Sequence, residues 1–248
     1  MMSLVTANPI ETVKKQFAFK MRGNIDAFSS LIGIQLLGLF FSIIGGIGSY
    51  GSHSSRMMIE AKYYSADLVI FFSIVWGFVT AITITTKPYR NHDFTYITNR
   101  VTSSMANFLF LLTASCIAGL TAMLSKYLIF LAHNLLFSQP FYGSVSSGKE
   151  FVIGLIVTVL YIFWASSIGY LIGTFVQVNR MFAFLIPVLF FGILFLDFIM
   201  TSEPFSQKLL TFYTMESSLI LFSLKTVITT ILLFLASISI LNRMEVRK

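Results

Sequence analysis

The chain has 248 residues, of which 56% are hydrophobic and only 11% are charged, whereas soluble domains carry about 25% charged residues. This composition excludes a conventional water-soluble enzyme, because so few charged side chains cannot cover the surface of a chain with 27 Phe. The net charge of +7 would favour a nucleic-acid partner in a soluble protein. In a chain this apolar, it raises instead the question of which membrane face the basic residues occupy.

The first segment, residues 1–26, has the pattern of an amphipathic helix that lies at the inner membrane surface. Asn8 can cap the helix start and Pro9 suits its first turn. The apolar residues at helical spacing are Ile10, Val13, Phe17 and Met21, and the basic ones are Lys14, Lys15, Lys20 and Arg22. An unstructured basic flank that only orients the first span is the alternative.

Apolar runs follow that are each long enough to cross a hydrocarbon core of about 30 Å as a helix. None alternates with period two, as a lipid-exposed β-barrel requires. We therefore predict an all-α integral membrane protein with a six-helix transmembrane domain over residues 27–248. The predicted spans are 27–50, 66–86, 106–132, 151–176, 181–200 and 218–241.

An even number of spans places both termini on one side of the membrane. With the termini in the cytoplasm, eleven Lys and Arg fall on the inner side and six on the outer side, out of 17. The positive-inside rule therefore predicts cytoplasmic termini. The acids balance the outer bases, so the whole excess of +7 lies inside, where it favours contact with anionic lipid and not with nucleic acid.

The connection near residues 89–100 places aromatic side chains among charges on the cytoplasmic side. A short helix here would present Phe94 and Ile97 as apolar anchors, which is typical of a protein docking surface. Its polar rim would be Arg90, Asp93 and Arg100. The alternative is that the aromatic residues form part of the interfacial belt of the membrane.

These features resemble the permease subunits of ABC-2 type transporters. The resemblance rests on the span count, the lead-in helix, Thr98-Asn99-Arg100 before the third span and the basic, acid-containing tail 242–248. It implies that residues 89–100 form a coupling helix seated in a cleft of a separate cytoplasmic ABC ATPase subunit. It also implies a dimer with itself or a second permease, ATP and Mg bound by the partner ATPase, and location in the bacterial plasma membrane.

The segment 143–150 matches a phosphate-binding loop except at its last position, where Glu150 replaces the Ser or Thr that holds magnesium. The predicted topology also places it outside the cell, so we expect no nucleotide site and no cofactor in this chain. His53, His92 and His133 form no metal-binding pattern, and the spans carry almost no catalytic groups. We therefore expect a transport subunit that is not itself an enzyme.

Lys126, Asp197 and Lys225 lie within predicted spans, where ionisable groups are costly and often functional. Snorkelling, or an ion pair between Asp197 and Lys225, is the structural interpretation, and substrate contact is the functional one. Residues 201–216 are too apolar for a free loop and too short to span, which indicates a re-entrant or interfacial segment. The small residues at 45–48 and 166–169 favour close helix packing, within the chain or in a dimer.

The family resemblance implies export, and the many Phe and Met suit amphipathic or antimicrobial-type peptides or other lipophilic compounds. The same residues would also serve simply to face lipid and fill the core. Two other functions remain open from the sequence: a non-ABC membrane channel, and a peptide-sensing or immunity protein of the membrane.

Overall fold

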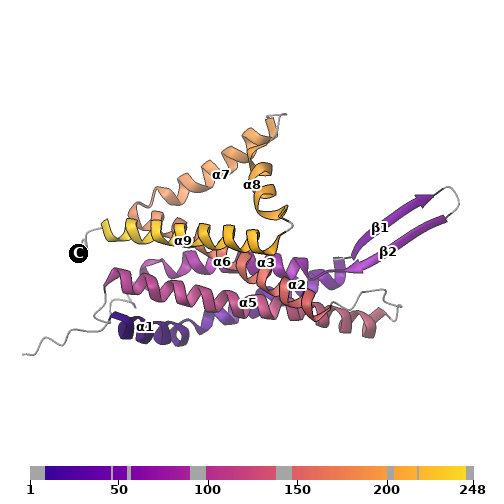
Figure 1. Ribbon diagram of the computed structural model, residues 1–248, viewed down its shortest axis with the longest axis horizontal. Coiled ribbons are helices and arrows are strands. Elements are labelled where there is room, and N and C mark those ends of the chain that lie inside the picture. The colour runs from indigo at the N-terminus through magenta and orange to yellow at the C-terminus, as the bar shows by residue number, and fades with distance from the viewer. Residues whose placement is uncertain are drawn as a thin grey trace, which may run out of the picture.

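The computed structural model describes residues 9–45, 47–54, 57–89, 99–137, 147–199, 204–216 and 218–243, and Figure 1 shows the arrangement of their elements. The helices are α1 (Pro9–Gly23), α2 (Ile25–Gly45), α3 (Asp67–Ile84), α5 (Arg100–Phe137), α6 (Gly148–Val178), α7 (Phe182–Ile199), α8 (Phe205–Thr214) and α9 (Leu219–Arg243). Strands β1 (Ile47–Ser54) and β2 (Met57–Tyr64) lie between α2 and α3.

The six helices α2, α3, α5, α6, α7 and α9 are each long and apolar enough to cross a membrane, which confirms the six predicted spans. The observed helix α5 is longer than its predicted span, because it begins at Arg100 and not at Ala106 and continues to Phe137. The difference arises because the apolar window that marks a span stops where polar residues begin, whereas backbone hydrogen bonding continues through them.

The β-hairpin is the main departure from the predicted all-α fold. Strands β1 and β2 pair antiparallel, from Ile47 opposite Tyr64 to Ser54 opposite Met57. The first span was predicted to reach Tyr50, but α2 ends at Gly45. The Gly-rich stretch around residues 45–51 explains the early end, because each Gly costs a helix about 1 kcal/mol relative to Ala.

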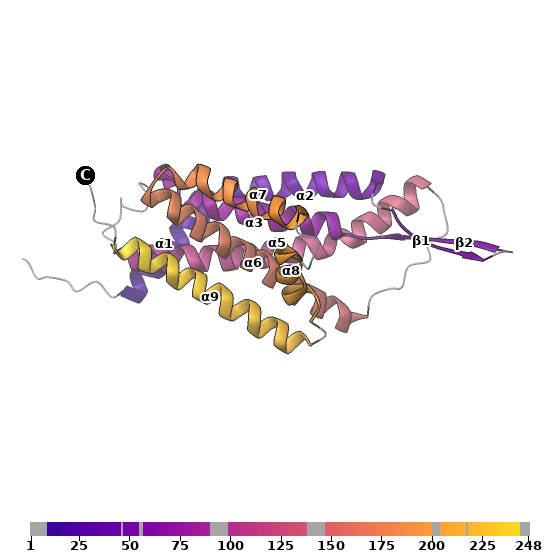
Figure 2. The same ribbon diagram turned by 90° about the horizontal axis from the view of Figure 1, so that it is seen from above.

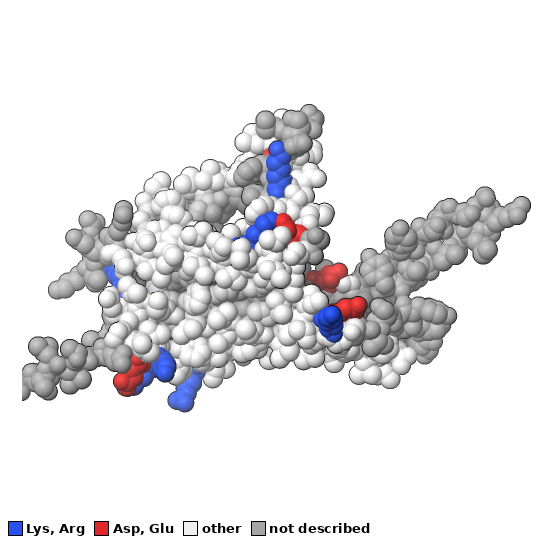
Figure 3. Space-filling view, viewed as in Figure 1, with Lys and Arg blue, Asp and Glu red and all other residues white. Residues whose placement is uncertain are grey.

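The spans other than α7 run side by side along the long axis, with α1 lying at the end of the bundle where α9 finishes (Figures 1 and 2). We call this end the terminal end, and the hairpin projects from the opposite end. Figure 1 also shows α7 leaning away from the other helices and meeting α8 at its far end. On the face drawn in Figure 3, charged side chains gather toward the two ends and around α8, with an uncharged surface between them.

Helices α3 and α6 approach so closely that only small residues fit between them. A Cβ added to Gly169 would lie 2.4 Å from the Phe78 carbonyl oxygen, and one added to Gly77 would lie 2.8 Å from Ser166 Oγ. Ser166 and Ser167 are buried in the same seam. The small residues at 166–169 therefore pack within the chain, whereas Gly45 ends α2 and Gly48 lies in β1.

An aromatic cluster joins α5, α6 and α9 on the other side of this seam. The Phe234 ring centroid lies 4.9 Å from that of Phe108, 5.1 Å from that of Tyr170 and 5.9 Å from that of Phe163. Phe110 is fully buried in the same cluster. Edge-to-face and tilted ring contacts of this kind give α9 a defined position against the bundle.

Candidate functional site

The structure describes only the two ends of the predicted coupling connection near residues 89–100. Arg90, Asp93, Phe94 and Ile97 lie outside the described residues, so their contacts with an ATPase stay a prediction. Tyr89 precedes that stretch and Arg100 follows it as the first residue of α5. These flanking residues show how the connection joins the bundle.

The first end is joined to α6 and the second to α9. Gln177, in the last turn of α6, donates a hydrogen bond from Nε2 to the Thr85 carbonyl oxygen. Arg100 donates from its guanidinium to the Leu241 carbonyl oxygen, with 2.6 Å between the atoms. The Thr85 hydroxyl in turn bonds the Ile82 carbonyl at 2.6 Å, which closes the last turn of α3. The end of α3 before the connection and the first residue of α5 after it are therefore bonded to helices that are distant in sequence.

Helix α1 packs on α5 through a face that carries polar side chains. Gln16 and Lys20 are 3% and 6% exposed, so Lys20 is not the surface cation that the sequence pattern predicts. The reason is that α5 offers the Lys20 ammonium a buried hydrogen-bond acceptor, the Oδ1 atom of Asn107.

The four predicted interfacial residues lie as follows. Lys14 is exposed, Val13 and Phe17 are half-buried, and the Met21 sulfur accepts a hydrogen bond from the Thr113 hydroxyl at 3.5 Å. The helix exists as predicted, while its position at a membrane surface stays a prediction.

Lys15 donates a hydrogen bond to Glu11 on the outward face of α1, with 2.8 Å between nitrogen and oxygen. That hydrogen bond, and then the positive charge of Lys15, hold the pKa of the Glu11 carboxyl below its ordinary value. A Glu four residues before a Lys is the favourable order for such a helical pair.

A chain of buried polar side chains extends inward from Lys20. Asn107 donates from Nδ2 to the Tyr170 hydroxyl at 3.3 Å, and Tyr170 donates to Ser104 Oγ, also at 3.3 Å. Asn107 and Ser104 come from α5 and Tyr170 comes from α6. Sequence reasoning missed this chain because its members come from three helices and lie far apart in the sequence. The available signal was an amide within a span, which is costly unless it is hydrogen-bonded.

Gln35 provides a second interhelical link, nearer the middle of α2. Its Nε2 atom donates to Ser73 Oγ on α3 at 3.0 Å and to the Ala118 carbonyl oxygen on α5 at 3.1 Å. Gln35 is 9% exposed, so these bonds form away from solvent. One amide thus holds three spans together.

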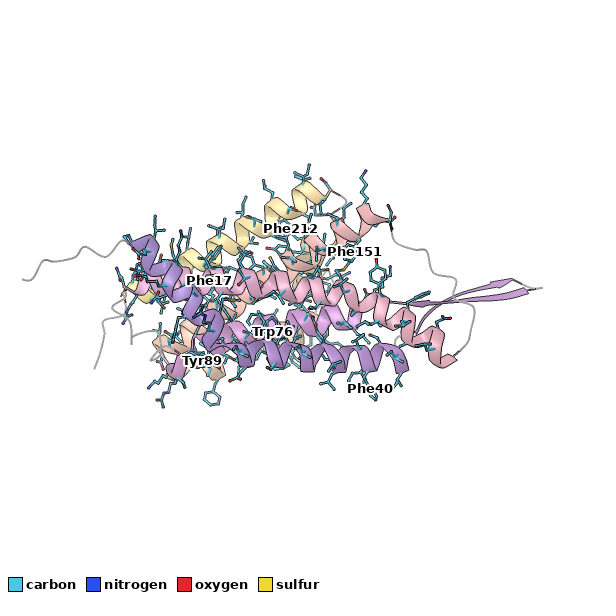
Figure 4. All side chains as sticks on the ribbon, turned by 90° about the horizontal axis from the view of Figure 1, so that it is seen from below. Phe17, Phe40, Trp76, Tyr89, Phe151 and Phe212 are labelled. Atoms are coloured by element: carbon cyan, nitrogen blue, oxygen red, sulfur yellow. The ribbon has the colours of Figure 1, made fainter. Side chains whose placement is uncertain are left out.

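A pocket of about 440 Å³ opens at the terminal end beside Lys20 and Asn107, and its wall includes Asn24, Asp26 and Tyr89. A second pocket of about 290 Å³ follows the groove between α2 and α3 and is lined by Trp76 among mainly apolar residues. Figure 4 shows Tyr89 at the terminal end and Trp76 farther along the bundle. A polar pocket and an apolar groove therefore adjoin.

Asp197 and Lys225, two of the charged residues predicted to lie within spans, contact other residues and not each other. Lys225 forms an ion pair with Glu216 and lies over the Phe212 ring, 4.1 Å from its centroid. The predicted Asp197–Lys225 pair is wrong, since Asp197 instead accepts a hydrogen bond from the Ser206 backbone N–H at 2.7 Å. Both corrections arise from the segment around α8, because Ser206 lies in its first turn and Glu216 lies just after its end. Lys126 lies half-buried on α5.

Among the described residues, no group of three or more His, Cys, Asp or Glu could hold a metal ion. Helix α8 spans ten residues, too few to cross a membrane, and it occupies most of the predicted segment 201–216. Whether that segment is re-entrant stays a prediction.

Comparisons with known proteins do not assign the chain to a family. No family model, curated protein or solved structure matches the chain. What the chain itself supports is a multi-pass helical protein with six helices able to cross a membrane.

Proposed function

We propose that this chain is the permease subunit of an ABC exporter, driven by a separate cytoplasmic ATPase and serving amphipathic peptides or other lipophilic compounds. The observation that carries the proposal is that the two helix ends flanking the connection near 89–100 are bonded to other helices, the end of α3 by Gln177 to Thr85 and the start of α5 by Arg100 to Leu241. A connection tied in this way passes a displacement directly to α6 and α9.

The mechanical argument follows from the rigidity of helices. When the ATPase subunits close on ATP, a coupling element held in their cleft moves as a unit. Because Arg100 bonds the last turns of α9, that motion pulls the terminal end of α9, and Gln177 passes it to α6. The tightly packed α3–α6 seam then moves as one body, which biases the bundle between two arrangements.

The exposed surface of α7 supports the dimeric part of the proposal. None of its described residues is buried, and Phe184 and Phe198 are 78% and 86% exposed. A second permease subunit packed there would bury part of this surface, and lipid would cover the remainder. The transport route would then lie between subunits or along the bundle.

The decisive experiment co-expresses the chain with a candidate ABC ATPase, such as one encoded beside its gene, and reconstitutes the complex in liposomes. Phe94→Ala should abolish ATP-dependent export of a fluorescent amphipathic peptide while ATP hydrolysis and membrane insertion persist. Phe40→Ala is the matched control, because Phe40 lies on α2 toward the other end of the bundle (Figure 4) and is 57% exposed. It should export normally.

A second variant tests the attachment itself. Arg100→Met should lower export per ATP hydrolysed, whereas Arg180→Met, which removes an exposed arginine in the α6–α7 turn, should leave this ratio unchanged. Normal export by Phe94→Ala would overturn the proposal. A stable assembly without any ATPase, with flux that does not require ATP, would favour a channel instead.

A further inference from the structure

The two pockets beside α2 and α3 adjoin, and together they give a site with a polar end, which is the larger pocket, and an apolar arm, which is the groove. They share four wall residues, Asn24, Asp26, Ile84 and Tyr89. Tyr89, which lines both pockets, lies at the terminal end, and Trp76, which lines the arm, lies farther along the bundle (Figure 4). A ligand that fills both parts must itself be amphipathic.

The polar end carries charges of both signs on one wall. Lys20 lines it with a buried ammonium, beside the amides of Asn24 and Asn107. Lys20 as a whole is 6% exposed and its ammonium already donates to Asn107 Oδ1, so an anion in this pocket would add to an existing polar contact in surroundings of low dielectric constant. Asp26, at the start of α2, lines the same pocket and is exposed. Lys20 and the two amides suit a phosphate, and Asp26 suits a ligand ammonium.

The apolar arm is lined by residues of α2 and α3. Its walls include Ile34 from α2 and Val75, Trp76 and Val79 from α3. Val79 is 52% exposed, so the arm is accessible from the lipid side. Trp76 is held in place, since its indole N–H lies 3.0 Å from Ser30 Oγ and 3.1 Å from the Ala27 carbonyl oxygen.

We propose that this cavity binds one phospholipid with a zwitterionic headgroup of the phosphoethanolamine type. Its phosphate lies against Lys20 and Asn107, its ammonium faces Asp26, and one acyl chain enters the α2–α3 groove past Trp76. The depth of the site fits this ligand, because the polar end lies where the spans begin and headgroups meet the hydrocarbon core. The proposal stands whether or not the chain works with an ATPase.

The chain has two tryptophans, so lipid binding at the site can be measured by tryptophan fluorescence. Trp164 packs against Tyr213 on α8, with ring centroids 4.7 Å apart, and does not line either pocket. In the Trp164→Phe variant, Trp76 is therefore the sole tryptophan and reports on the groove. The full chain in dodecylmaltoside micelles is titrated with phosphatidylethanolamine brominated on its acyl chains, because the bromines quench a tryptophan that they contact.

The expected result is saturable quenching of Trp76 at a few lipids per protein. Lys20→Met should raise the half-saturating lipid concentration at least tenfold, whereas Lys14→Met, which removes an exposed cation from the same helix, should leave it unchanged within twofold. Val79→Phe, which fills the arm without removing a buried contact, should also abolish saturation. Quenching that rises linearly with lipid, or equally in wild type and Lys20→Met, overturns the proposal.

Headgroup chemistry is tested by exchanging the lipid. Brominated phosphatidylglycerol, which lacks the ammonium, should bind at least fivefold more weakly, and Asp26→Asn should erase this difference. Equal binding of the two lipids overturns the role of Asp26. Inorganic phosphate should compete only at millimolar concentrations, and competition at micromolar concentrations would instead assign the pocket to a free phosphate compound.

Native mass spectrometry of the wild-type chain gives a readout that does not depend on the Trp164→Phe background. One phosphatidylethanolamine adduct per chain should survive in wild type and Lys14→Met and be lost in Lys20→Met. A wild-type spectrum without this adduct, after incubation with the lipid, overturns the proposal.

Discussion

Helix α7 and the α3–α6 seam are built from similarly apolar sequence and are packed in opposite ways. In the seam, glycines let the backbones of two helices touch, and buried serines fill the remaining space. In α7 none of the described residues is buried, and a Cβ added to Gly192 would meet nothing within 4 Å. Hydrophobicity marks both as spans, but it does not distinguish the centre of the bundle from its margin.

The physical reason is that lipid is as apolar as a Leu side chain, so apolar residues gain little by leaving lipid for the bundle. Helices then associate where small residues allow van der Waals contact and where polar side chains find partners. The seam has both, whereas in α7 a Cβ on Gly192 would meet no neighbour and Asp197 accepts its hydrogen bond from Ser206 in α8 and not from another span. Small and polar residues therefore carry the packing information in this chain.

The largest expected effect is that of Gly169→Val in the seam. The added side chain would meet the Phe78 carbonyl 2.4 Å away, and a backbone atom cannot move aside as a flexible side chain can. Overpacking a core typically lowers the free energy of unfolding by about 1–3 kcal/mol, and we expect a loss near the upper end of that range. Loss of monodisperse protein after mild heating in detergent would measure it. An unchanged melting temperature would contradict the close packing of α3 against α6 at Gly169.

A smaller effect is expected from Gln35→Leu, which removes the amide that links α2 to α3 and α5. Ser73 keeps its other hydrogen bond, to the Val69 carbonyl at 2.7 Å, so only the interhelical bonds are lost. Such bonds contribute about 0.6 kcal/mol each on average in membranes. Unfolding in sodium dodecyl sulfate should therefore shift by about 1 kcal/mol, and Leu36→Ala on the lipid-exposed face of α2 serves as the control.

The attachment of α8 to α9 should be weaker still. Lys225 and Glu216 are each about a quarter exposed, so solvent screens their attraction. A double-mutant cycle with Lys225→Met and Glu216→Gln should give a coupling energy of about 0.5 kcal/mol. The same cycle with Asp197→Asn in place of Glu216→Gln should give no coupling energy. A larger coupling to Asp197 would restore the pair that the sequence predicts.

The smallest effect is expected from Gly192→Val in α7, which is the counterpart of Gly169→Val. Because no atom lies near the added side chain, stability should change by no more than about 0.5 kcal/mol in the monomer. The same unfolding measurement checks it. A loss as large as that of Gly169→Val would show that α7 is packed against something in the purified protein, such as a second subunit.

Much of the architecture is readable from the sequence because a membrane imposes a length. A run of apolar residues long enough to cross the hydrocarbon core must be a helix, so the six spans are predictable and confirmed. The small residues at 166–169 also predict close packing, since only they let backbones approach. By contrast, the hairpin at 47–64 was missed, because Ile47 and Tyr50 extend the apolar run past the end of the helix at Gly45.

What the tertiary structure decided is the identity of partners. Lys20 reads as a surface cation in the sequence but lies buried against Asn107, 87 positions away. Lys225 pairs with Glu216, in the short connection between α8 and α9, and not with Asp197. Span formation depends on local composition, so the sequence by itself determined it. The choice of partner for a polar group depends on which helices meet, and only the packed bundle decides that.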